Sequence, residues 1–196
     1  IRSTLEHLRP DARFHLVSNP EFLREGTGVH DSLEPDRLLV GADGAEGFDA
    51  MRRLYAPLLE RGVRLIETDV ATAELAKHAS NAFLALKISY ANALARICEL
   101  VGADVDAVTH VMGSDPRIGP VFLGAGLGYG GYCLPKDVAA FERLAERLGY
   151  PFPMLAEVAR INDEAVRAVL ERLRDEVREL SGSRVAVLGL SFKPGT

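Results

Sequence analysis

Cys133 lies in a loop whose residue types suit a catalytic nucleophile. Gly128, Gly130 and Gly131 precede it, and glycines allow a backbone to approach a ligand closely. Lys136 follows it near the expected start of a helix, and both the ammonium group and the helix N-terminus favour a thiolate. Because a thiolate attacks carbonyl carbon, the loop predicts covalent catalysis, although a structural cysteine in a tight loop has the same local pattern.

Two pairs of polar side chains could assist such a nucleophile. Lys77 and Asn81 are four residues apart in a predicted helix with apolar neighbours, so they share one face. Lys77 could stabilise a developing oxyanion, or its stem could be buried while its ammonium reaches solvent. Glu21 and Glu25 follow a predicted strand, where open α/β sheets bind ligands, and either could act as a base or belong to an acidic first helical turn.

The spacing of Gly126, Gly128 and Gly131 matches G-x-G-x-x-G, the fingerprint of dinucleotide-binding domains. That fingerprint requires a strand before it and a helix directly after it. Here a loop precedes the glycines and Cys-Leu-Pro follows them, so we interpret the match as a coincidence.

The elements expected to position these residues change in character along the chain. Residues 4–9 are predicted to end a helix, and strands are predicted over 14–17, 38–41 and 63–67. A helical pattern over 45–60 lies between the last two strands, and this alternation is typical of a parallel, doubly wound sheet.

The second part of the chain is predicted to be helical. Asp69 is the expected cap of a helix that continues to about residue 101, because apolar residues recur every three or four positions without Pro or Gly, and Gly102 ends it. Asp104 is the expected cap of a shorter helix over 104–111, and a loop rich in Gly and Pro is expected over 113–135. The remaining predicted elements are helices over 136–148 and 153 to about 180, and an apolar strand over 184–190.

The expected fold class is therefore α/β plus an all-helical middle. Residues 1–68 are predicted to end an N-terminal Rossmann-like domain, and residues 69–181 to form a helical central domain with one long helix. Residues 182–196 are predicted to start a second Rossmann-like domain with its first strand. The chain begins Ile-Arg-Ser without an initiator Met and stops just after an apolar strand, so we expect a fragment of a longer protein.

The composition narrows the class of protein. The chain is 47% hydrophobic and 26% charged with a net charge of −5, which is typical of a soluble globular protein and argues against a nucleic-acid binder. Charged and polar residues interrupt its apolar runs, so no transmembrane helix is predicted. Cys98 lies in an apolar helical pattern and is predicted to be buried, and two cysteines do not make a disulfide framework. Without a recognisable signal peptide, we expect a cytoplasmic location.

Six motifs carry a family resemblance. In chain order they are NPEFLREG, PDRLLVG, ELAKHASNAFLALKISYANAL, GSDPRIG, GYGGYCLPKD and GLSFKPGT. Together they resemble the UDP-glucose/GDP-mannose dehydrogenase family over essentially the whole chain. The resemblance implies oxidation of a sugar C6 hydroxyl to a carboxylate with two NAD⁺, and a homodimer formed through the long central helix. It also implies that the GxGxxG segment precedes Ile1, and the GYG sequence favours UDP-glucose as the substrate.

The resemblance implies a catalytic role for five residues. Cys133 would attack the aldehyde to give a thiohemiacetal, which is then oxidised to a thioester. Lys77 would steady the charge on oxygen, and Asn81 would help to hold the sugar and a water. Glu21 would act in thioester hydrolysis, and Asp137 would be linked with Lys77 and the water.

The resemblance also implies contacts with cofactor and substrate. Glu25 and Lys136 match residues near the cofactor, and Arg117 matches an arginine that reaches the substrate of the neighbouring subunit. No metal is expected. The other implied substrate contacts are Phe22, Leu23, Phe122, Tyr129, Gly130, Phe192 and Lys193. The family often has Ser before the cysteine, where this chain has Tyr132, which could change the loop or the pocket wall.

Three alternatives remain open. The substrate could be GDP-mannose or a UDP-N-acetylhexosamine. The chain could instead be a cofactor-independent thiol enzyme such as an acyl transferase, which would need a histidine near Cys133; the five histidines form no suitable motif. As a fragment, the chain would lack most of both nucleotide-binding domains, so on its own it could be an inactive dimerisation unit.

Overall fold

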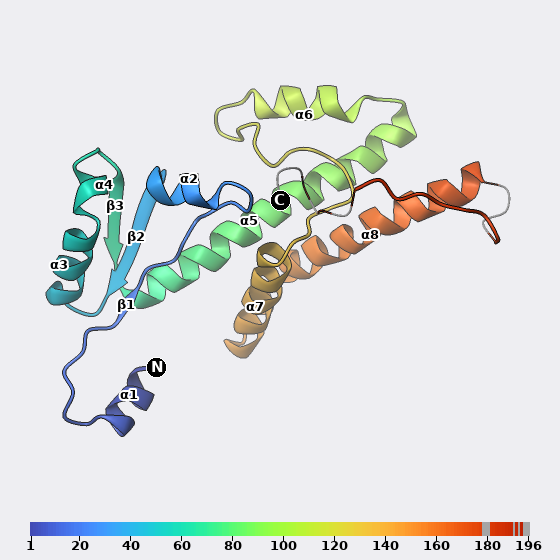
Figure 1. Cartoon of the computed structure of the whole chain (residues 1–196). Helices are drawn as coiled ribbons and strands as arrows, with labels where there is room; N and C mark the ends of the chain where they lie inside the picture. The colour runs from blue at the N-terminus through green and yellow to red at the C-terminus, as the bar shows by residue number, and fades with distance from the viewer. Residues whose placement is uncertain (178–180, 190, 192, 194–196) are drawn as a thin grey trace. The chain divides into compact units, whose positions relative to one another are not determined.

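Figure 1 shows a computed structural model that describes residues 1–177, 181–189, 191 and 193. The chain forms two compact units, Ile1–Lys77 with Lys193–Thr196 and His78–Phe192. The boundary between them falls inside one long helix.

The first unit is built on a sheet of strands β1 (Val17–Ser18), β2 (Arg37–Ala42) and β3 (Arg64–Thr68), in the order β1-β2-β3. The predicted parallel pairing is confirmed for β2 and β3, and Val40 in β2 is fully buried. The first strand differs from the prediction, because it is only two residues long and runs antiparallel to β2. Asn19 and Pro20 end this strand. The Asn19 side chain donates a hydrogen bond to the Leu39 carbonyl at 2.7 Å, and proline has no N–H to donate to a neighbouring strand.

Four short helices complete this unit: α1 (Arg2–Leu8), α2 (Gly28–Leu33), α3 (Ala45–Leu54) and α4 (Ala56–Leu59). The single helix predicted over 45–60 is divided at Tyr55. Pro57 explains the break, because it cannot donate a hydrogen bond back into the preceding turn. Helix α2 has no counterpart in the prediction.

The long helix α5 (Val70–Val101) confirms the prediction in length and position. Asp69 caps it by accepting hydrogen bonds from the Thr72 backbone N–H at 2.8 Å and the Thr72 hydroxyl at 2.6 Å. Its other end is Gly102, whose φ of 71° is in the left-handed region that glycine adopts readily. The start of α5 packs closely on β2, because a Cβ at Gly41 would lie 2.6 Å from Ala73 Cβ.

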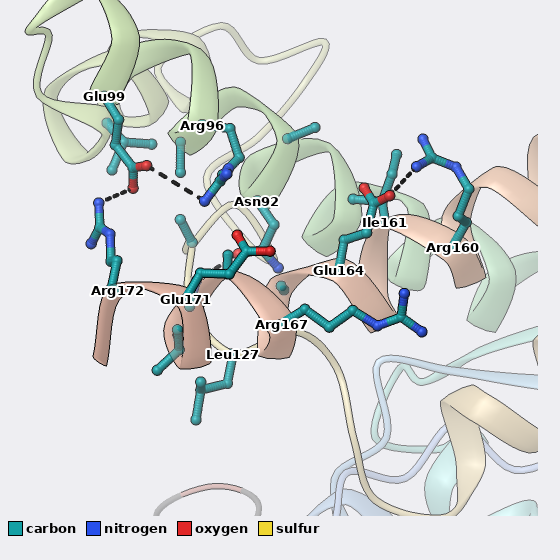
Figure 2. A pocket seen from close by; sticks show the side chains of 18 residues that line it. Asn92, Arg96, Glu99, Leu127, Arg160, Ile161, Glu164, Arg167, Glu171 and Arg172 are labelled. Atoms are coloured by element: carbon teal, nitrogen blue, oxygen red, sulfur yellow. Dashed lines mark hydrogen bonds and ion pairs between the residues drawn. The ribbon is translucent and has the colours of Figure 1, made fainter. Parts of the chain in front are cut away.

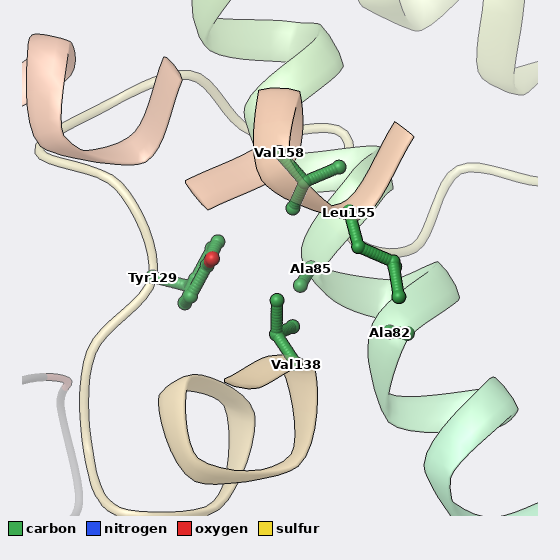
Figure 3. Packing of buried hydrophobic residues seen from close by; sticks show 6 residues of the cluster. All are labelled: Ala82, Ala85, Tyr129, Val138, Leu155 and Val158. Atoms are coloured by element: carbon green, nitrogen blue, oxygen red, sulfur yellow. The ribbon is translucent and has the colours of Figure 1, made fainter. Parts of the chain in front are cut away.

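The second unit packs α6 (Val105–Gly113), α7 (Cys133–Arg147) and α8 (Pro153–Glu176) around the rest of α5. The predicted cap of α6 is confirmed, since Asp104 accepts from the Asp106 N–H at 2.9 Å. Figure 3 shows the core side chains pointing toward one another from α5, α7, α8 and the loop before α7. The six residues drawn are Ala82, Ala85, Tyr129, Val138, Leu155 and Val158. The two alanines of α5 leave room for the neighbouring helices to approach closely.

Two boundaries differ from the prediction. Helix α7 begins at Cys133, three residues earlier than expected, because Pro135 falls in its first turn, where a missing N–H costs no helical hydrogen bond. Helix α8 ends at Glu176, and residues 178–180 lie outside the described part of the chain. The strand predicted over 184–190 is absent from 184–189, since a strand requires a paired neighbour and the described sheet contains β1, β2 and β3 alone. Residue 190 is not described.

Candidate active site

The first cluster of predicted site residues joins Glu21 to Lys77 within the first unit. The Lys77 ammonium donates to the Glu21 carbonyl at 2.5 Å and lies 3.0 Å from Glu21 Oε1. The other carboxylate oxygen accepts from the Leu23 N–H at 2.7 Å. The Lys77 side chain is only 17% exposed, so its head is held by a partner and does not extend into solvent.

The Phe22 ring completes this cluster. Lys77 Nζ lies 5.3 Å from the ring centroid, and the Arg37 guanidinium lies 4.1 Å from it. Two cations therefore contact one aromatic ring, which fixes the orientation of Phe22 beside the Lys77–Glu21 pair. Arg37 was not predicted as a site residue, because its contact with Phe22 connects β2 to a loop fifteen residues earlier.

A groove of about 270 Å³ lies over the loop before α2 and the start of β2. Asn19 braces it, accepting from the Tyr55 hydroxyl at 2.5 Å while donating to the Leu39 carbonyl. The charged lining residues are Glu21, Asp31, Glu34, Asp36, Arg24 and Arg37. Because carboxylates outnumber arginines here, this lining suits hydrogen-bond donors such as hydroxyl and amide groups better than a phosphate.

Arg24 and Asp31 clamp one side of the groove. Asp31 is buried and accepts from the Arg24 backbone N–H at 2.8 Å, from the Arg24 guanidinium at 2.5 Å and from the Thr27 hydroxyl at 2.9 Å. The hydrogen bond from Arg24 holds the pKa of Asp31 well below its usual range, against the effect of burial. Glu25, next to Arg24, is exposed.

The second cluster is centred on Asp137 in the second unit. This carboxylate is 2% exposed and accepts from Asn81 Nδ2 and from Lys136 Nζ, each at 2.6 Å. His78 Nδ1 lies 3.6 Å from it and has no hydrogen-bond partner among the described residues. Burial alone would raise the pKa of Asp137, but the hydrogen bonds from Lys136 and Asn81 and the charges nearby outweigh it and lower the pKa. The family resemblance linked Asp137 with Lys77 and a water, and its contacts with Asn81 and His78 were not predicted.

Cys133 is the first residue of α7 and is half-buried. Lys136 lies one turn later, and its pKa is raised chiefly by the hydrogen bond to Asp137 and further by the charges of Asp137, Cys133 and Tyr132. Tyr132 places its ring 5.7 Å from the Lys136 ammonium. The structure therefore brings the cysteine, the lysine and the buried carboxylate together, as one helical turn requires.

The other predicted contact residues, in the loop before Cys133, differ in exposure and backbone conformation. Arg117 is 87% exposed and bound to Asp115, so its guanidinium faces solvent. Phe122 has a φ of 66°, an uncommon and costly conformation for a bulky residue and one that is frequent at ligand sites. The Tyr129 ring lies in the hydrophobic core, whereas Gly130 is exposed.

The three remaining predicted substrate contacts are Leu23, Lys193 and Phe192. Leu23 is exposed and takes part through its backbone N–H, as described above. Lys193 is half-buried. Phe192 lies outside the described residues.

A larger groove, of about 850 Å³, lies between the C-terminal half of α5 and α8. Figure 2 shows Glu99 between Arg96 and Arg172, and the ion pair between Arg160 and Glu164. These two glutamates pair with three of the arginines that line the groove. None of the predicted catalytic residues lines it in the described part of the chain.

The described residues hold no group of three or more His, Cys, Asp or Glu side chains that could bind a metal ion. None of the described helices is long and apolar enough to cross a membrane.

Comparison with known proteins places these clusters in context. Residues 1–59 match the NAD binding domain of the UDP-glucose/GDP-mannose dehydrogenase family, and residues 71–164 match the central domain of the same family. The chain is 47% identical over 183 residues to the UDP-glucose 6-dehydrogenase AglM of Haloferax volcanii, covering 92% of this chain and 42% of that protein. It is 40% identical over 191 residues to the UDP-glucose 6-dehydrogenase YwqF of Bacillus subtilis, covering 97% and 43%.

Solved structures agree with the sequence matches. The fold is similar to a UDP-glucose dehydrogenase from Pyrobaculum islandicum, with a TM-score of 0.86 and 36% identity over 89% of this chain and 40% of that one. It is also similar to the UDP-N-acetyl-mannosamine dehydrogenase Cap5O from Staphylococcus aureus, with a TM-score of 0.74 and 25% identity over 97% and 43%. The chain spans about two fifths of the length of the curated relatives it matches. On both domain matches, the chain belongs to the UDP-glucose/GDP-mannose dehydrogenase family of NAD-binding oxidoreductases, as its six motifs indicated.

Proposed function

We propose that the protein containing this chain oxidises the C6 hydroxyl of UDP-glucose to a carboxylate, with Cys133 as the covalent nucleophile. The observation that carries the proposal is the geometry around Cys133. Cys133 is the first residue of α7, and the Lys136 ammonium one turn later is held in place by the buried Asp137. The named relatives support UDP-glucose as the substrate.

The reaction removes four electrons from one carbon. The C6–H hydride and the hydroxyl proton leave first, giving an aldehyde. The Cys133 thiolate then forms a bond to C6 and the carbonyl oxygen takes a proton, giving a thiohemiacetal. Loss of a second hydride and a proton gives a thioester, and attack by water breaks the S–C bond to release the carboxylate and regenerate the thiol. NAD⁺, when bound, supplies the acceptor for each of the two hydrides.

The polar residues of α5 stabilise charge on the reacting oxygen in this proposal. Lys77 supplies a cation whose position is set by its contacts with Glu21, and Asn81 supplies an amide set by Asp137. Both donors belong to one helix, one turn apart, so little reorganisation is needed when charge develops. In this proposal Lys77 is an electrostatic catalyst. The alternative was a lysine whose ammonium reaches solvent, but the Lys77 side chain is only 17% exposed.

Glu21 is the proposed base for hydrolysis of the thioester. Its side chain is half-exposed, so a water can reach it, while the Leu23 N–H and Lys77 fix its orientation. Asp137 helps to hold that water through its partner Asn81. Glu25 and Lys136 are the proposed cofactor neighbours, and Arg117, which faces solvent here, is the proposed contact to the substrate of a second subunit.

We also propose that the protein is a homodimer formed through α5. The large apolar side chains Phe83, Tyr90 and Ile97 are spaced by seven residues along this helix, and each is more than half exposed. An apolar stripe of this kind is typical of a surface that another chain covers. Sedimentation of the full-length protein tests this: Tyr90→Lys should convert a dimer to a monomer, and a wild-type protein that is monomeric at high concentration would contradict it.

A cytoplasmic location accompanies the proposed chemistry, because a nucleophilic thiol needs a reducing compartment to stay active. A periplasmic or secreted protein, recovered with an oxidised Cys133, would contradict it.

The decisive assay measures NADH formation by the full-length protein. UDP-glucose should yield two NADH per molecule and UDP-glucuronate, whereas GDP-mannose and UDP-N-acetylglucosamine should yield little. Cys133→Ser should abolish acid formation, with Cys98→Ala as the control for losing a cysteine elsewhere. Unchanged NADH production by Cys133→Ser would refute the mechanism, and turnover of GDP-mannose without turnover of UDP-glucose would refute the substrate.

A further inference from the structure

The loop that leads into Cys133 obtains backbone hydrogen bonds from a side chain of α8. The Tyr129 N–H donates to Asn162 Oδ1 at 2.7 Å, and Asn162 Nδ2 donates to the Tyr129 carbonyl at 3.1 Å. One carboxamide thus satisfies both backbone groups of Tyr129, as a neighbouring strand would do in a sheet. This is a specific pairing between residues 33 positions apart.

The adjacent glycine is adapted to this contact in two independent ways. Gly128 has a φ of 99°, in the region that only glycine enters readily. A Cβ built at Gly128 would also overlap the Asn162 carboxamide. The backbone therefore approaches Asn162 more closely than any larger residue would permit.

Tyr129 transmits this contact to the rest of the loop. Its ring is 9% exposed and packs with Val138 of α7 and Val158 of α8, so both its backbone and its side chain are fixed. Only three residues separate Tyr129 from Cys133, a tether of at most about 14 Å. Fixing Tyr129 therefore restricts where the thiol at the start of α7 can lie.

We propose that Asn162 is a positioning residue for the substrate loop, defined as residues 122–132, and through it for Cys133. The proposal rests on the function proposed above, because it assigns Asn162 a part in presenting the nucleophile. Asn162 does not touch the reacting atoms in this scheme. It acts by holding the Tyr129 backbone, and Gly128 provides the clearance.

The contact is tested by hydrogen–deuterium exchange in the full-length protein. Asn162→Ala should speed exchange of the Tyr129 amide by about 10- to 30-fold, the effect of losing one or two hydrogen bonds. Asn162→Asp keeps an acceptor for that amide and should retain most of the protection, which also covers the case in which the alanine variant fails to fold. Asp175→Ala, an exposed change on the same helix, should alter nothing.

Positioning is tested by thiol reactivity, which requires neither substrate nor cofactor. The rate at which iodoacetamide alkylates Cys133 should differ from the wild-type rate by about 10-fold in Asn162→Ala and by less in Asn162→Asp. The rate in Asp175→Ala should equal the wild-type rate. With UDP-glucose, Asn162→Ala should raise KM and lower kcat, and Asn162→Asp should recover part of both.

Steric coupling gives an additional criterion. Gly128→Ala should be less harmful to loop protection in the Asn162→Ala background than in wild type, because the clashing carboxamide is gone. Unchanged exchange of the Tyr129 amide, or a loosened loop with unchanged Cys133 reactivity, would overturn the proposal. A wild-type protein that does not oxidise UDP-glucose would refute the proposed function, whereas the exchange and alkylation results would still decide the role of Asn162.

Discussion

Replacing Tyr129 with phenylalanine tests how the substrate loop is held in the core. Burial raises the pKa of Tyr129 to about 12, and the negative charges of Asp163 and Glu142 add to the effect. Phenylalanine keeps the ring that packs on Val138 and removes only the ionisable hydroxyl. The Tyr129→Phe variant should therefore fold normally at neutral pH and differ from wild type in alkaline solution.

The magnitude follows from the displaced pKa. Because the folded state favours the neutral phenol, its contribution to stability is fully present below pH 10 and is lost as the pH rises from 10 to 12. The wild-type protein should lose roughly 1.4 kcal/mol more than Tyr129→Phe between pH 8 and pH 11, and roughly 2 to 3 kcal/mol more by pH 12. Comparing the two proteins cancels the other groups that titrate in this range.

Urea unfolding of the full-length protein at several pH values measures this difference. Tyr150→Phe is the matched control, because the Tyr150 ring is 66% exposed. An alkaline loss of stability in Tyr129→Phe that equals the wild-type loss would refute the burial argument. The same would follow if Tyr150→Phe protected the protein as well as Tyr129→Phe did.

Three other substitutions test the clusters and the start of α5. Asp137→Asn should lower the free energy of unfolding at pH 7 by about 1 to 3 kcal/mol, because Asn81 loses a charged acceptor. The pKa of Asp137 is lowered in the folded state, so its contribution to stability is lost as the pH falls through that folded pKa. The difference in free energy of unfolding between wild type and Asp137→Asn, measured with urea, should therefore shrink at low pH. A difference independent of pH would contradict this. Gly41→Ala should destabilise by about 1 to 3 kcal/mol in the same assay, because its methyl group would overlap Ala73, and an unchanged urea midpoint would show that β2 and α5 are loosely packed. Asp69→Ala should lower the thermal midpoint by removing the cap of α5 while Asp69→Asn preserves it, and equal midpoints for the two variants would argue against the cap.

The parts of the site that follow from local rules could be predicted from the sequence. The extent of α5 was predictable because Asp69 caps it, Gly102 ends it and apolar residues recur at helical spacing between them. The contact between Lys136 and Asp137 follows from their adjacency at the predicted start of a helix, whereas the position of Cys133 on the same helix was not predicted.

The contacts between distant segments could not be predicted in this way. No local pattern connects Asn162 with Tyr129, or His78 with Asp137, because each pair is brought together by the packing of helices. The position of Pro135 was misleading for a different reason. Proline is a strong helix breaker in general, but in the first turn it is tolerated, so α7 starts at the cysteine itself.

That early start strengthens the physical case for Cys133. Cys133 is the first residue of a helix of 15 residues and so lies at its N-terminus, whereas a helix that began at Lys136 would have left the cysteine in the preceding loop.

The arrangement of α5 gives the two proposed oxyanion donors a common frame. The boundary between the compact units falls between Lys77 and His78, within a helix that continues on both sides. Four residues of α-helix advance about 6 Å and return to the same face, so the spacing of Lys77 and Asn81 is set by backbone hydrogen bonds. Within the first unit Glu21 contacts Lys77, and within the second unit Asp137 contacts Asn81. A motif that requires lysine and asparagine four residues apart is therefore best carried by an uninterrupted helix, and α5 provides one.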